Sequence, residues 1–169
     1  MKCGSFLFAM ALAIPSTSWG FNDIINGEVS ESVDDYPSTG GMLAGTEVNY
    51  GRNTAEIKML MCSSTLIAPD VVLLAAHCID FTYYEQMAGI PFDDADIGFS
   101  RKADLTALAG FPAQVWPDDI VLAWEALPHP GFGSVQNMEI GLAENDDIAL
   151  LFLEEPILDL APAILPTAE

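Results

Sequence analysis

The sequence predicts an all-β protein built as an antiparallel barrel or sandwich. Short apolar runs alternate with turn-forming Gly, Pro, Asn and Asp residues, and no long stretch has helical periodicity. Apolar residues make up 51% of the chain, which argues against disorder. A length of 169 residues is sufficient for one domain with a hydrophobic core.

The chain opens with a segment typical of an export signal. Lys2 supplies positive charge, residues 6–14 form an apolar stretch, and Ser18-Trp19-Gly20 fits a small-x-small cleavage site. The apolar stretch is too short to cross a bilayer, and no later segment is long enough. We therefore expect residues 1–20 to be a signal peptide and the protein to be secreted or periplasmic, with no membrane anchor.

Beyond the signal, the apolar runs that lie between turn signals are predicted strands. The region around Gly40-Gly41 and Gly51 is expected to be loop-like, and residues 105–109 are expected to form a helical turn or a loop. The predicted strands are Ile57–Cys62, Ser64–Ile67, Val71–Leu74, Ala95–Phe99, Ala113–Trp116, Ile120–Ala126 and Ile148–Leu153.

The charge is strongly acidic, with 25 Asp and Glu residues against five Lys and Arg residues and a net charge of −20. Such a surface repels nucleic acid and anionic membranes, so we expect neither as a partner. Acidic groups at Asp93-Asp94-Asp96 and Asp118-Asp119 could attract calcium, but their spacing does not match an EF-hand loop. No cofactor is therefore expected, and calcium stays an open alternative.

Two cysteines remain once the signal, with Cys3, has been removed. In an oxidising compartment an isolated pair, Cys62 and Cys78, is most simply a disulfide. A metal site with His77 as a further ligand is the competing interpretation. His77 and Cys78 directly follow the apolar run of residues 71–76, so a strand would present them at its end.

Three stretches in this order resemble the chymotrypsin/trypsin-like serine proteases, the S1 class of peptidases. The first is Ile-Ile-Asn-Gly at residues 24–27, like the opening of that family's mature chains. The second runs from Cys-Ser-Ser-Thr-Leu-Ile at residues 62–67 to Ala-Ala-His-Cys at 75–78. The third is Asn-Asp-Asp-Ile-Ala-Leu-Leu at residues 145–151. The resemblance extends over residues 24–166.

The resemblance implies a fold and a set of roles. Residues 24–166 would form the first six-stranded antiparallel barrel of a two-barrel protease, residues 167–169 the start of the interdomain linker, and residues 21–23 a short propeptide. His77 would be the general base, Asp147 would orient its ring, and Cys62 and Cys78 would be bonded. Ile24 would be the activation N-terminus, although Asp23 precedes it where the family usually has Arg or Lys.

One departure from the family pattern limits the predicted activity. The family order is His, Asp and then a Ser in a Gly-Asp-Ser-Gly-Gly type motif, but no serine follows Ser134 in this sequence. We therefore expect a secreted serine endopeptidase acting on proteins or peptides, present here as an N-terminal fragment that is inactive alone. The missing second barrel would come in cis or in trans. The alternatives are a non-catalytic binding module derived from a protease barrel, or one chain of a two-chain protease.

Overall fold

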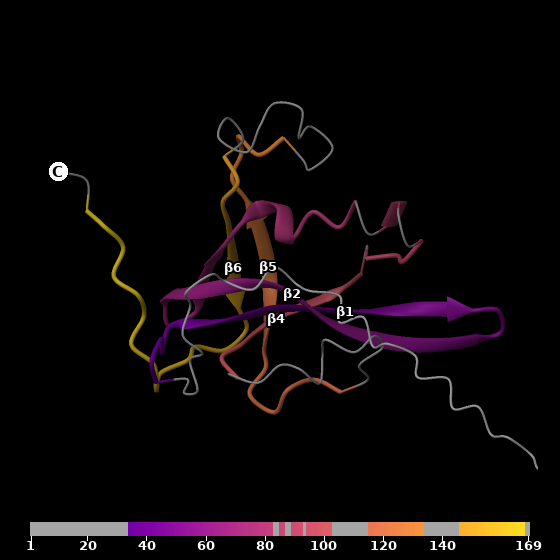
Figure 1. Cartoon of the computed structure of the whole chain (residues 1–169), viewed down its shortest axis with the longest axis horizontal. Helices are drawn as coiled ribbons and strands as arrows, with labels where there is room; N and C mark the ends of the chain where they lie inside the picture. The colour runs from indigo at the N-terminus through magenta and orange to yellow at the C-terminus, as the bar shows by residue number, and fades with distance from the viewer. Residues whose placement is uncertain are drawn as a thin grey trace, which may run out of the picture.

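Six antiparallel strands close into a barrel, as the sequence predicts for the fold class (Figure 1). The computed structural model describes residues 34–82, 85–86, 89–92, 94–102, 115–133 and 146–167. The strands are β1 (Thr39–Tyr50), β2 (Asn53–Ala68), β3 (Val71–Leu74), β4 (Asp96–Ser100), β5 (Val121–Pro128) and β6 (Ala149–Leu153), with a short 3₁₀ helix, η1 (Ala76–Cys78), after β3.

The strand order around the barrel is β1-β2-β3-β6-β5-β4, and β4 pairs with β1 to close it. Alternate side chains of each strand point inward, as the pleat requires. Closure leaves the described sheet without a free edge strand. The largest fully buried side chains are Phe99, Met42, Leu43, Ile57, Leu66, Leu151 and Val72.

β2 is long because two bulges let it bend around the barrel. Its register with β1 shifts between Met42 and Leu43, and its register with β3 shifts between Leu66 and Ala68. Each bulge adds an unpaired residue, which bends the strand and increases its twist. The two strands predicted at Ile57–Cys62 and Ser64–Ile67 are therefore one continuous strand.

The prediction of a loop around Gly40-Gly41 was wrong, because these residues lie in β1. A Cβ atom on Gly40 would stand 2.4 Å from the carbonyl oxygen of Ser100 and 2.6 Å from the ring of Phe99. The glycine thus permits close approach of β4 and its buried Phe99 ring.

The remaining predicted elements have mixed outcomes. The strands at Val71–Leu74, Ala95–Phe99, Ile120–Ala126 and Ile148–Leu153 are confirmed to within two residues. In the predicted strand Ala113–Trp116, the described residues Val115 and Trp116 are not in a strand; the Trp116 ring packs against Leu43 and lies beside Gly45 instead. The signal peptide, residues 21–23, Ile24 and residues 105–109 lie outside the described residues.

Candidate functional site

His77 sits at the centre of the single 3₁₀ turn η1, immediately after β3. The turn is held by two backbone hydrogen bonds, from Cys78 N to Ala75 O and from Ile79 N to Ala76 O, each 3.1 Å long. Ala76 and Cys78 are buried on either side, whereas the His77 side chain is 41% exposed. The two buried neighbours therefore fix the backbone of a histidine whose ring reaches solvent.

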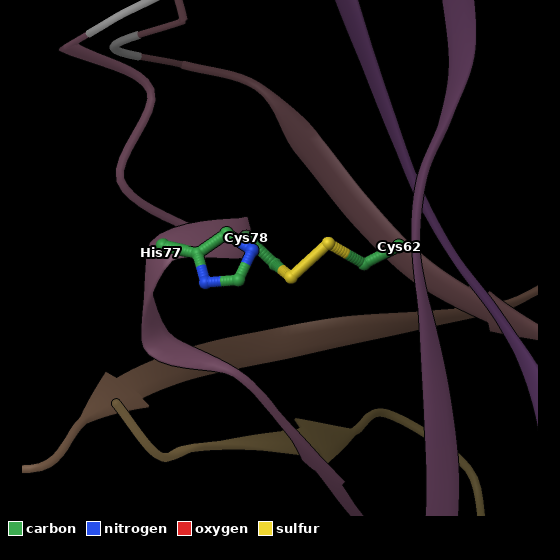
Figure 2. A group of neighbouring side chains, drawn as sticks. All are labelled: Cys62, His77 and Cys78. Atoms are coloured by element: carbon green, nitrogen blue, oxygen red, sulfur yellow. A yellow bond between two sulfur atoms is a disulfide. The ribbon is translucent and has the colours of Figure 1, made fainter. Parts of the chain in front are cut away.

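A disulfide ties this turn to the neighbouring strand β2. Cys62 and Cys78 are bonded, with 6.0 Å between their Cα atoms, and Figure 2 shows the bond beside the His77 ring. One donor atom of each of these three residues lies within 4.8 Å of the others. Both sulfurs are consumed in the disulfide, so neither is available as a thiolate ligand, and the metal interpretation loses two of its three donors.

Asp147 is hydrogen-bonded to both the ring and the backbone of His77. Its Oδ2 lies 2.7 Å from Nδ1 of the ring, and its Oδ1 accepts a 2.8 Å hydrogen bond from the His77 backbone N–H. The carboxylate lies just before β6, and β6 pairs with β3, with Ala149 opposite Leu74. Pairing of these two strands thus brings together residues that are 70 positions apart in the chain.

The surroundings of Asp147 favour its ionised form. Burial opposes ionisation, since only 16% of the side chain is exposed, but hydrogen bonds from the His77 ring and backbone, the charge of the ring and the Ala76 amide outweigh it. The pKa of Asp147 is therefore held below its ordinary value of 3.8.

This contact fixes which ring nitrogen carries the proton. An ionised carboxylate can only accept hydrogen bonds, so Nδ1 of His77 must donate. In the neutral imidazole the lone pair is then on Nε2. No described residue forms a hydrogen bond with Nε2 of His77. The arrangement can accept a proton at Nε2 and stabilise the resulting imidazolium through Asp147.

The two backbone amides that hold Asp147 were not predicted from the sequence. Any residue has an amide, so no sequence signal marks those of Ala76 and His77; only the geometry of the turn reveals them. A pocket of about 500 Å³ beside the turn was not predicted either. The pocket is lined by Ala76, Ile79, Asp80, Thr82, Ile97, Ala126, Pro128, Phe132 and Gly133.

His129, the second histidine, lies in an exposed turn after β5. Its Nδ1 accepts a 3.1 Å hydrogen bond from the Gly131 N–H and lies 3.3 Å from Oδ2 of Asp146. The first contact needs a lone pair on Nδ1 and the second needs a proton there, so they do not coexist. The shorter contact closes the turn, which gives His129 a structural role.

Of the acidic groups considered for calcium, Asp118 and Asp119 have protein partners. The Lys102 ammonium lies 2.8 Å from Asp118, and its hydrogen bond and charge hold the pKa of that carboxyl below its usual value. Asp119 accepts hydrogen bonds from the Ser100 hydroxyl at 2.6 Å and the Arg101 N–H at 3.0 Å.

Comparison with known proteins adds no assignment, because no protein-family profile and no curated protein matches this chain. Among the described residues, no helix has the length and apolar character needed to cross a membrane.

Proposed function

We propose that this chain supplies the general base and its orienting carboxylate to a secreted serine endopeptidase that cleaves proteins or peptides. The observation that carries the proposal is the double contact of Asp147 with the ring and the backbone of His77. The disulfide of the adjacent Cys78 supports the oxidising compartment that secretion implies.

The proposed chemistry follows from the geometry of the pair. His77 Nε2 would take the proton of a serine hydroxyl as that oxygen attacks the scissile carbonyl, and would then pass it to the departing amine. Asp147 would hold the ring in the required tautomer and stabilise the imidazolium. The carboxylate stays ionised throughout, because Nδ1 keeps its own proton.

The nucleophile must come from polypeptide other than the residues that follow Asp147, which include no serine. Among the described residues, no serine hydroxyl is hydrogen-bonded to His77. An oxyanion hole would likewise have to be supplied with the serine, since acyl transfer needs both. A second barrel, in cis or in trans, would satisfy this requirement.

A fluorophosphonate probe tests the proposal, because it labels only an activated serine. The gene is expressed in its native host from genomic DNA with flanking sequence, and the product is isolated through antibodies against this chain. We expect a labelled serine on the same polypeptide or on one bound to it. His77→Ala should abolish labelling, and Asp147→Asn should slow it roughly 10⁴-fold, the loss known for triads with that change.

His129→Ala is the matched control and should leave the labelling rate unchanged, because this histidine serves the exposed turn. Absence of any reactive serine in the isolated product would reject the proposal and favour a binding module. Labelling that survives His77→Ala would reject the role assigned to His77.

A further inference from the structure

The outer surface of three adjacent strands is apolar on the side that should meet water. In β6, Leu151 is fully buried in the barrel, so Leu150 and Phe152 point outward by the alternation of the strand. Leu150 is paired with Leu73 of β3 on one side and with Leu127 of β5 on the other. Three neighbouring strands thus present apolar side chains outward in one row.

Further apolar side chains extend this row. Val71 of β3 pairs with Phe152, and the Trp124 ring of β5 lies 5.6 Å from the Phe152 ring. Trp124, Leu127 and Ile148 are 64%, 50% and 53% exposed. Strands that are apolar on both sides are typical of sheets covered on both sides. We name these residues the β3–β6–β5 face: Val71, Leu73, Trp124, Leu127, Ile148, Leu150 and Phe152.

The β3–β6–β5 face is separate from the core and is hollowed at one end. None of its residues packs against the buried cluster of the described barrel. A hollow of about 270 Å³ opens where the end of β5 meets the start of β6. Its lining is Leu127, Pro128, His129, Pro130, Ile148, Ala149 and Leu150. An apolar hollow of this kind suits one bulky anchoring side chain.

Acidic residues border the β3–β6–β5 face. Glu125 is paired with Phe152 across the strands, Glu154 directly follows β6, and Asp70 precedes β3; all three are exposed. No described Lys or Arg belongs to β3, β5 or β6. Glu125 is thus the one charged residue in these three strands, and the flanking residues Asp70 and Glu154 are acidic as well.

We propose that the β3–β6–β5 face binds a polypeptide whose contact surface has apolar side chains at its centre and Lys or Arg residues around them. Charge complementarity selects this partner: a second copy would bring another net charge of −20 against the acidic border. The proposal does not depend on the catalytic role proposed for His77.

The test uses a designed amphipathic peptide of about 18 residues with a leucine stripe and lysines elsewhere. Calorimetry should show one peptide bound per chain, and Trp124 emission should shift to the blue. Leu127→Glu should weaken binding at least about tenfold, because it places a charge at the centre of the contact. Trp124→Phe should keep binding but remove the shift.

Leu60→Glu is the matched control, since it makes the same change at an exposed leucine of β2 that pairs with β1 and not with β3. Leu60→Glu should leave the affinity for the peptide within about twofold of the wild-type value. The thermal unfolding midpoint of each variant is measured to show that the variant is folded. A peptide with the same composition but no leucine stripe should bind at least about tenfold more weakly.

Three outcomes would overturn the proposal. The first is equal weakening by Leu127→Glu and Leu60→Glu, which would mean that only the overall charge is recognised. The second is a dimer in sedimentation that Leu127→Glu dissociates, which would identify a second copy as the occupant. The third is binding to zwitterionic vesicles, abolished by the same substitution, without binding to the peptide.

Discussion

A histidine can act as a base at one defined nitrogen when its other ring nitrogen is hydrogen-bonded to a fixed partner. One oxygen of Asp147 accepts a hydrogen bond from Nδ1 of His77, and its other oxygen accepts one from the backbone N–H of the same residue. The ring can then neither flip nor exchange its tautomer without losing a hydrogen bond to a charged group. Such bonds are worth about 1.5–3 kcal/mol, more than the neutral kind.

Replacing Asp147 with Asn tests this contact through stability. The amide side chain keeps the shape but loses the charge, so we expect the free energy of unfolding to fall by about 1–3 kcal/mol near pH 7. Urea unfolding monitored by circular dichroism provides the measurement. Asp146→Asn, one residue earlier and exposed, should change the value by less than about 0.5 kcal/mol.

The same comparison has a defined pH dependence. Because the pKa of Asp147 is lowered in the folded state, its contribution is complete above the unfolded value of 3.8 and is lost as pH falls through the lower folded value. The difference between wild type and Asp147→Asn should therefore narrow as pH falls below 3.8 and vanish once pH lies below the folded value. A difference that widened on acidification would contradict the lowered pKa.

The individual site residues could be predicted only in part from the sequence. The local pattern marks His77 and Cys78 as the end of a strand, but nothing local links His77 to a carboxylate 70 residues away. That link came from the resemblance alone. The structure places Asp147, not the neighbouring Asp146, against the His77 ring.

The elements that carry the site are joined by one covalent tie. The disulfide links β2 to η1, so the turn that holds His77 is fixed by β2 as well as by its contact with Asp147. Closing a loop of this size stabilises a protein by about 3 kcal/mol in the chain-entropy calculation, because it restricts the unfolded chain.

Removing the tie with Cys62→Ala and Cys78→Ala together should therefore lower the free energy of unfolding by about 3 kcal/mol. Urea unfolding with and without a reductant provides the measurement: reductant should destabilise the wild type by a similar amount and leave the double variant unchanged. Equal sensitivity of both proteins to reductant would show that the effect is not due to this bond.

Strand β1 shows why one whole element was not predicted from the sequence. Glycine in a sequence usually marks a turn, but Gly40 lies in a strand because the Phe99 ring and the Ser100 carbonyl occupy the space of its side chain. That requirement comes from β4, about 60 residues later in the chain, and is invisible to a local pattern. β3, whose limits were correct, is bounded by the local Pro69-Asp70 turn.

At the scale of the whole molecule, the short apolar runs separated by turn residues were enough to predict an all-β fold. The same pattern does not predict the order of the strands around the barrel. The order β1-β2-β3-β6-β5-β4 depends on β6 returning to pair with β3. The pairing of β6 with β3 creates both the His77–Asp147 pair and the β3–β6–β5 face. It brings Asp147 to His77 and places Leu150 between Leu73 and Leu127. The apolar outer side of β6 could have been read from its uninterrupted run of apolar residues.

The charge of the whole chain predicts how stability depends on salt. With 25 acidic and five basic residues, folding concentrates like charges that the unfolded chain keeps further apart. Screening reduces this repulsion, so the free energy of unfolding should rise as sodium chloride is added. Most of the gain should come between about 0.01 and 0.1 M, where the Debye length falls from about 30 to 10 Å.

Urea unfolding in a salt series measures this rise in the free energy of unfolding, and potassium chloride should give the same curve. Sucrose, which strengthens burial without screening charge, should give a gradual rise with no such saturation. A curve that was flat or falling in salt would show that local pairs such as Lys102–Asp118, which screening weakens, outweigh the net repulsion.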